Sequence, residues 1–109
     1  MKKNFISILI TNHNKNKYLK KNLKKCFSQT YSKFEVIIYD DRSFDGSLET
    51  IKKFKKINLI KNKKNYFSPP LNQLKGIISA FNKSKGNIIC LMDSDDYFGK
   101  NKLNLINKY

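Results

Sequence analysis

Four short apolar runs alternate with four segments of helical periodicity along this chain of 109 residues. The apolar runs, rich in Ile, are predicted to form strands over Phe5–Thr11, Phe34–Tyr39, Ile57–Ile60 and Asn87–Met92. The remaining segments are predicted to form helices over Asn16–Ser28, around Leu48, Ile51 and Phe54, over Leu71–Asn82 and over Lys100–Lys108. In the third helix, the spacing places Leu74, Ile77, Ile78 and Phe81 on one face. The alternation indicates one α/β domain, an open parallel sheet with helices on both faces.

The order of the strands predicts where a ligand binds. With right-handed crossovers, a chain that starts this way commonly forms a sheet of order 3-2-1-4. Ligands bind outside the carboxyl edge of such a sheet where the strand order reverses, here between the first and fourth strands. Three loops should meet there, at residues 11–14, 40–46 and 93–96. Six of the chain's eight acidic residues lie in the last two of these loops, which predicts a ligand site in an otherwise basic protein.

The loop Asp93-Ser94-Asp95-Asp96 directly follows the apolar fourth strand. Alternation along a strand would turn Asp93 and Asp95 toward one ligand and Asp96 away from it. Carboxylates this close repel each other, and Mg²⁺ or Mn²⁺ relieves the repulsion while it binds substrate phosphate oxygens. The competing interpretation is that Asp residues simply favour turns and helix N-caps. The apolar strand before the loop and the second acidic loop beside it favour the metal site.

The other two loops carry residues with two interpretations each. Asp40 and Asp41 either cap the following helix or accept hydrogen bonds from a nucleotide base or ribose. His13 either stacks on a flat ring or is a solvated loop residue. The residues alone leave both alternatives open.

The formal net charge of +15 does not by itself identify a partner. Of the 23 basic residues 22 are Lys, scattered along the chain, and Arg, the better fork for phosphate and guanine, occurs once. We therefore expect no specific nucleic acid partner, although a basic nucleic-acid-binding domain is an alternative. No apolar run approaches the ~18 residues of a membrane span, and no signal peptide is recognised. Two separate Cys residues without metal or disulfide spacing favour a reducing, cytoplasmic setting.

Several ordered motifs resemble the family 2 glycosyltransferases of the GT-A fold, which is Rossmann-like. Residues 6–15 resemble the family's first strand and its T-x-Y-N turn. Residues 27–41 resemble Q-T-Y-x-x-F-E-I-I-V-V-D-D, residues 43–47 resemble S-T-D-G-T, and residues 85–96 resemble K-G-E-Y-I-x-F-L-D-S-D-D. The resemblance runs from about Phe5 to Leu103 and implies the N-terminal, nucleotide-sugar-binding half of that fold.

The resemblance also implies roles for the matching residues. His13 lies where an aromatic residue usually lies against the base, Asp41 contacts the base, and Asp93 lies near the ribose and diphosphate. Asp95, with Asp93, would hold the divalent metal, Mn²⁺ or Mg²⁺, that stabilises the leaving nucleoside diphosphate. The residues expected to bind the nucleotide sugar are Thr11, His13, Asp40, Asp41, Lys75, Asp93 and Ser94.

The chain departs from the family pattern in two places. An A-R-N-x-G segment often precedes the fourth strand, and counted back from Gly86 its Arg and Asn positions are Ile77 and Ile78. Residues 72–76 are a partial substitute, with Lys75 as a candidate phosphate contact. The chain also ends soon after the acidic loop, whereas the family's acceptor half and catalytic base follow it. We therefore expect residues 1–109 to form a partial domain, with the base beyond Tyr109.

Together these features predict a metal-dependent, inverting glycosyltransferase, or a fragment of one that binds only the sugar donor. The expected donor is a nucleotide-diphosphate sugar, most simply a UDP-sugar, and the acceptor a glycan or a lipid-linked glycan. The expected location is the cytoplasm, with peripheral association at the inner face of the membrane. A second alternative is a receiver-like phospho-acceptor domain. That fold has an acidic pair after its first strand, whereas the first strand here ends in Thr11-Asn12.

Overall fold

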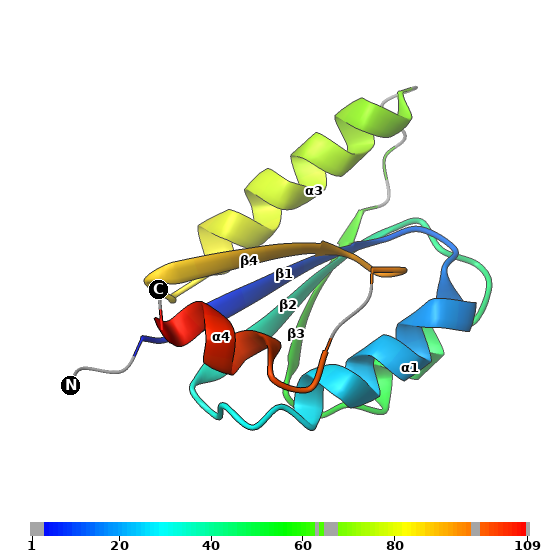
Figure 1. The fold of residues 1–109 in the computed structure, drawn as a ribbon. Helices are drawn as coiled ribbons and strands as arrows, with labels where there is room; N and C mark the ends of the chain where they lie inside the picture. Colours follow the sequence, from blue (N-terminus) through cyan, green and yellow to red (C-terminus); the bar gives the residue numbers. More distant parts are fainter. Residues whose placement is uncertain (1–3, 63, 65–67, 97–98, 109) are drawn as a thin grey trace.

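The structure is a computed structural model that describes residues 4–62, 64, 68–96 and 99–108. Strands and helices alternate throughout these residues, as predicted (Figure 1). The elements are β1 (Ile6–Asn12), α1 (Asn16–Phe27), β2 (Phe34–Asp41), α2 (Ser47–Lys52), β3 (Ile57–Asn62), α3 (Pro69–Lys83), β4 (Ile88–Asp93) and α4 (Lys102–Lys108). The strands run one or two residues further toward their carboxyl ends than the apolar runs indicated, which carries the first acidic residues into the sheet.

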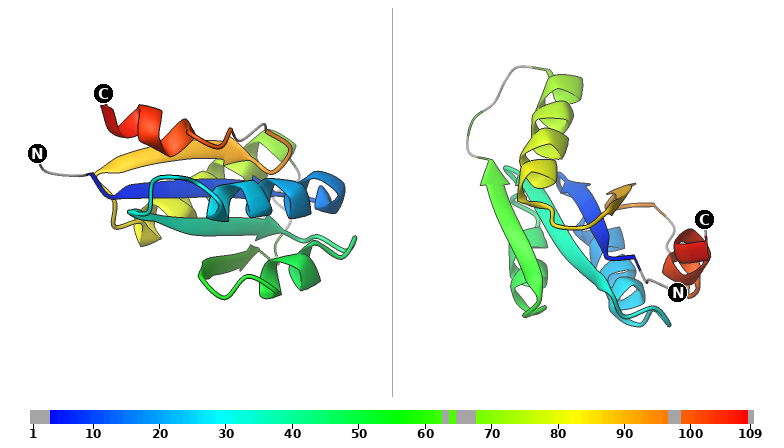
Figure 2. Two further views of the ribbon diagram at one scale, coloured as in Figure 1. Left: turned by 60° about the horizontal axis from the view of Figure 1, so that its bottom comes forward. Right: turned by 90° about the vertical axis from the view of Figure 1, so that its left-hand side faces the viewer.

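The four strands form one parallel sheet of order β3-β2-β1-β4, which confirms the predicted order. Figure 2 shows the strands side by side in this order. In the register of the sheet, Thr11 of β1 is flanked by Tyr39 of β2 on one side and by Asp93 of β4 on the other. The carboxyl ends of β1, β2 and β4 therefore meet at one edge, where the predicted loops converge.

Helices cover both faces of the sheet. Helix α3 lies on one face, and α1, α2 and α4 lie on the other (Figures 1 and 2). Alternation along β1 supplies both layers, because Ile6, Ile8 and Ile10 enter the larger core cluster on the α1 side while Leu9 packs with Ala80 on the α3 side. The burial of the two central strands, β1 and β2, on both faces accounts for their nearly continuous apolar runs.

The apolar face of helix α3 is not the face that packs on the sheet. Leu74, Ile78 and Phe81 are about half exposed and point away from the sheet, whereas the buried positions are Asn72, Gly76 and Ala80. The small residues allow the helix to lie close to β2: a Cβ on Gly76 would meet a ring carbon of Tyr39 at 2.3 Å. Close approach of the backbone therefore decides which face of α3 packs on the sheet.

None of the described helices combines the length and the hydrophobicity that crossing a bilayer requires.

Candidate functional site

A cavity of about 390 Å³ opens at the carboxyl edge of the sheet, between the ends of β1, β2 and β4 and the start of α3. It brings together six residues that the sequence predicted: Thr11, His13, Asp41, Asp93, Ser94 and Asp95. Two predicted residues, Asp40 and Lys75, do not line it. The remaining lining residues are Asn12, Lys15, Tyr39, Arg42, Pro69, Asn72 and Gln73. We call this space the edge cavity.

Asp93 is held from two sides. The Thr11 hydroxyl, directly opposite on β1, donates a hydrogen bond to Oδ1 of Asp93 at 2.9 Å. The side-chain amide of Gln73, from the first turns of α3, donates to the same oxygen at 2.7 Å. The carboxylate at the end of β4 is thus fixed jointly by the sheet and by the helix above it.

The acidic loop is a turn and not a continuation of the strand, because β4 ends at Asp93. Asp93 and Asp95 line the edge cavity and Asp96 does not, which agrees with the expectation that Asp96 faces away from the ligand. Asp96 nevertheless stays close to its neighbours, because its Oδ2 accepts a hydrogen bond from the backbone N–H of Asp93 at 2.8 Å. Asp93, Asp95 and Asp96 each offer one oxygen, and these oxygens lie within 4.8 Å of one another. Exposed carboxylate oxygens gathered this closely fit a hard divalent cation such as Mg²⁺ or Mn²⁺.

Other groups complete the surroundings of this turn. The Lys15 ammonium, just before α1, lies 3.8 Å from Oδ2 of Asp95. Ser94 is buried beneath the turn, where its N–H donates to the Thr11 carbonyl at 3.1 Å and its carbonyl accepts from the Asn22 amide at 2.8 Å. Backbone contacts of Ser94 therefore tie the acidic turn to β1 and α1.

Asp41 closes the opposite wall of the edge cavity. Burial opposes its ionisation, but hydrogen bonds from Arg42 at 2.8 Å and from the Asn62 amide at 2.9 Å outweigh burial and hold the pKa of this carboxyl below its usual value. The carboxylate is ionised at neutral pH, and it can accept hydrogen bonds from a ligand. Arg42 has a positive φ of 55°, an uncommon conformation for a residue with a side chain.

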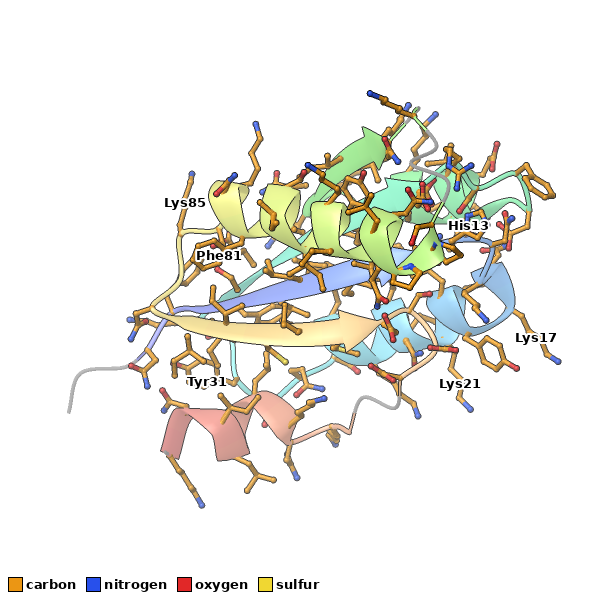
Figure 3. All side chains as sticks on the ribbon, turned by 90° about the horizontal axis from the view of Figure 1, so that it is seen from above. His13, Lys17, Lys21, Tyr31, Phe81 and Lys85 are labelled. Atoms are coloured by element: carbon orange, nitrogen blue, oxygen red, sulfur yellow. The ribbon has the colours of Figure 1, made fainter. Side chains whose placement is uncertain are left out.

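His13 lies at the mouth of the edge cavity, beside the start of α3 in Figure 3. Its Nδ1 is 2.5 Å from the backbone carbonyl oxygen of Asp41. Because a carbonyl only accepts, Nδ1 carries the hydrogen in this contact. The contact joins the β1–α1 loop to the β2–α2 loop and orients the imidazole ring against the cavity.

Asp40 has a structural environment. Its side chain is 1% exposed and accepts hydrogen bonds from the Asn12 amide at 2.8 Å and from the Ser43 N–H at 3.0 Å. Neither carboxylate caps α2, because Asp40 bonds Asn12 and Ser43 within the loops and Asp45 is the residue bonded to the first residue of the helix. Asp41 is the one of the two that lines the edge cavity.

Asp45, one residue before the N-cap Gly46, binds the first residue of α2 and links two loops. Its carboxylate accepts from the backbone N–H groups of Ser47 at 3.1 Å and of Asn16 at 2.9 Å. Burial works against ionisation here too, but a hydrogen bond from the Ser47 hydroxyl at 2.5 Å, together with these backbone bonds, prevails and lowers the pKa of Asp45. The neighbouring Gly46 has φ of +94°, which a residue with a side chain adopts only with strain. This part of the acidic loop therefore shapes the site without lining it.

Sequence reasoning missed Lys15 and Arg42, and named Asn72 and Gln73 only as part of a substitute segment. A usable signal existed for Gln73. It is a polar residue in the first turns of α3, three positions before Gly76, at which the helix packs against the Tyr39 ring. Counting back from Gly86 pointed instead to Ile77 and Ile78, of which the edge cavity includes neither.

Comparison with known proteins identifies the family. Residues 7–108 match the sequence model of glycosyl transferase family 2. The chain belongs to this family. Among curated relatives, an uncharacterized glycosyltransferase of Haemophilus influenzae is 36% identical over 102 residues, which are 90% of this chain and 39% of that protein. The Escherichia coli UDP-Glc:alpha-D-GlcNAc-diphosphoundecaprenol beta-1,3-glucosyltransferase WfaP is 34% identical over 90% of this chain and 38% of its own length.

Among solved structures, residues 1–349 of TarS from Staphylococcus aureus, in complex with UDP, superpose with a TM-score of 0.81 at 26% identity. The superposition covers 93% of this chain and 30% of that one. The predicted GT-A fold is confirmed by this likeness. The family 2 chain described here spans about two fifths of the length of the two curated relatives.

Proposed function

We propose that this family 2 domain binds a nucleotide-diphosphate sugar as the donor site of an inverting, metal-dependent glycosyltransferase. The observation that carries the proposal is the convergence of Thr11, Asp41 and the Asp93–Asp95 turn on one cavity at the switch point of the sheet. A UDP-sugar is the favoured donor, since the E. coli relative is named for UDP-Glc and the similar TarS structure holds UDP. Residues 1–109 would supply the nucleotide-binding part of the reaction.

The nucleoside would lie between the ends of β1 and β2. There the ionised Asp41 accepts hydrogen bonds from N–H or hydroxyl groups of the base or ribose. His13 offers a flat face from the neighbouring loop, and Tyr39 forms part of the cavity wall. We assign these contacts to Asp41 and leave Asp40, which is buried beneath the loop, to hold the loop in shape.

The diphosphate would lie over the acidic turn. Asp95 and Asp93 would hold a divalent cation there, with Asp96 close by. When bound, such an ion neutralises the charge that develops on the leaving nucleoside diphosphate. Lys15, which lies beside Asp95, is placed to contact phosphate oxygens from the other side of the turn.

The acceptor in this proposal is a glycan or lipid-linked glycan, as the name of the E. coli relative indicates for that protein. Association with the inner face of the membrane would bring the domain to such an acceptor. The formal charge of +15 and the exposed apolar residues on the outer face of α3 support a contact with an anionic bilayer. The two free, buried Cys residues are consistent with a cytoplasmic location.

Calorimetric titration of the 109-residue chain with UDP, with and without Mn²⁺, tests the donor site. We expect UDP to bind more tightly when Mn²⁺ is present, and Asp95→Ala to remove that gain. Glu49→Ala is the matched control, because it deletes one exposed carboxylate on α2 outside the edge cavity. Failure of the folded chain to bind UDP, or equal Mn²⁺ dependence in Asp95→Ala, would contradict the proposal.

A further inference from the structure

We propose that Gln73 is a positioning residue that fixes the orientation of Asp93 for the bound cation. The inference rests on the proposed function, because it concerns the same site. Gln73 lies on α3, whereas the other predicted contacts lie in the acidic turn and in the loops that follow β1 and β2. Gln73 would act through Asp93, without contacting the reacting atoms.

The two oxygens of the Asp93 carboxylate differ in their hydrogen bonds. Oδ1 accepts from both Thr11 and Gln73, at 2.9 and 2.7 Å. Within the described part of the chain, no hydrogen bond reaches Oδ2. With two donors from two separate elements on Oδ1, rotation of the carboxylate is restricted, and Oδ2 stays available to a cation in a fixed direction.

The fold explains why Gln73 reaches this position. Ser68 caps α3 by accepting from the Leu71 N–H at 3.4 Å, and Pro69 occupies the first turn. Gly76 then lets the helix lie against the Tyr39 ring. Gln73 precedes Gly76 by about one turn on the side toward β4, so close helix packing carries the amide within reach of Asp93.

Gln73 also forms part of a wall between two cavities. Thr11, Gln73 and Asp93 line both the edge cavity and a smaller neighbouring cavity of about 160 Å³. The smaller cavity continues along the α3–β4 side with apolar residues such as Ile77 and Leu91. The hydrogen-bonded trio therefore closes the edge cavity on its apolar side, where the carboxylate would otherwise be free to turn.

The chemical type of Gln73 suits this task. Its amide donates a hydrogen bond without adding a charge, so it orients the carboxylate and leaves the negative charge available to the cation. A Lys or Arg in this place would donate as well, but it would also repel a divalent ion by its own charge. A neutral donor is what an oriented metal ligand requires.

The test measures Mn²⁺ affinity in the presence of UDP by electron paramagnetic resonance, which detects free Mn²⁺ without any turnover. We expect Gln73→Met and Thr11→Val each to weaken Mn²⁺ binding by about threefold to tenfold. The loss is smaller than that of an isolated hydrogen bond to a charged group, because the other donor still holds Oδ1 of Asp93. In the double variant the fold-loss of Mn²⁺ affinity should exceed the product of the two single fold-losses, because both donors share one oxygen of Asp93. Thr11→Ser, which keeps the hydroxyl, should restore binding.

The control is Asn82→Met, an exposed polar residue of α3 far from the cavity, which should leave the Mn²⁺ affinity unchanged. Thermal unfolding of Gln73→Met should stay close to that of the parent chain, which a purely structural role would not allow. Unaltered Mn²⁺ affinity in Gln73→Met, with binding still abolished in Asp95→Ala, overturns the role of Gln73 and leaves the proposed function standing. Absence of Mn²⁺ binding by the parent chain overturns both.

Discussion

The side-chain amide of Asn12 donates a hydrogen bond to Oδ1 of Asp40 at 2.8 Å, across the carboxyl ends of β1 and β2. Both side chains are buried, and Asp40 also accepts from the Ser43 N–H. The Ser43 hydroxyl in turn accepts from the Asn14 N–H at 2.9 Å. A network that is buried at Asn12 and Asp40 and partly buried at Ser43 therefore fixes the two loops that carry His13 and Asp41 before any ligand arrives.

Asp40→Ala should lower the free energy of unfolding by about 1–3 kcal/mol. It removes the acceptor of the Ser43 N–H and leaves the buried Asn12 amide with only the Ser43 hydroxyl, at 3.2 Å. Urea unfolding followed by circular dichroism measures the change. Glu49→Ala, which removes an exposed carboxylate, should change stability by no more than about 0.5 kcal/mol. Equal stabilities of the two variants would contradict the structural role of Asp40.

Gly76→Ala should destabilise the domain by about 1–3 kcal/mol, the usual cost of overpacking, although Ala favours helices. The added Cβ would meet the Tyr39 ring at 2.3 Å, so α3 must move away from β2. The measurement is the midpoint of urea unfolding. Asn82→Ala on the exposed side of the same helix should be neutral or slightly stabilising, and a stabilised Gly76→Ala would show that α3 does not pack this closely.

Stability should fall as the pH rises above about 9. Burial, with a smaller contribution from the neighbouring Cys90, raises the pKa of Cys26 from 9.0 to about 12. Between these values the unfolded chain releases a proton that the folded chain retains, so alkali favours unfolding by up to about 1.4 kcal/mol per pH unit. The slope of unfolding free energy against pH from 9 to 11 should be smaller in Cys26→Ala, and identical slopes would count against this assignment.

The outer face of α3 should contribute to binding of anionic membranes. Leu74 is 52% exposed on this face, and Figure 3 places Phe81 and Lys85 at the end of the helix farthest from His13. In flotation with equimolar phosphatidylglycerol and phosphatidylcholine vesicles, Leu74→Glu should weaken binding several-fold. Leu105→Glu is the matched control, since Leu105 is 53% exposed on α4, across the sheet. Equal losses of vesicle binding in both variants would indicate that the added negative charge weakens binding wherever it is placed, and that the α3 face makes no specific contact.

Much of the fold follows from local patterns. Apolar runs such as Ile6–Ile10 identified strands buried on both sides, and the rules for right-handed crossovers gave the strand order. The acidic residues that follow β2 and β4 could be located for the same reason, because parallel strands end at a common edge. These inferences depend on periodicity and on topology, which one sequence displays.

Other features depend on contacts between distant segments. Periodicity placed Leu74, Ile78 and Phe81 on one face of α3, but it could not show that this face is exposed. The opposite face packs on the sheet through the contact of Gly76 with Tyr39, which is a tertiary contact. The roles of Asp40 and Asp41 could not be separated, since adjacent carboxylates differ only in which loop groups they meet. Gln73 was not identified because the family's Arg and Asn positions were counted back from Gly86. That count ended at Ile77 and Ile78, about one turn further along α3.

The most direct test of the account is the position of a bound Mn²⁺ ion in the presence of UDP. Mn²⁺ broadens the nuclear magnetic resonance signals of amides near it, and a substoichiometric titration of ¹⁵N-labelled protein shows which amides broaden first. We predict that residues 93–96, with Thr11 and Gln73, broaden before all others and that Asp95→Ala removes the effect. Broadening that begins elsewhere, or that is the same in Asp95→Ala, would contradict a nucleotide-sugar site at the edge between β1 and β4.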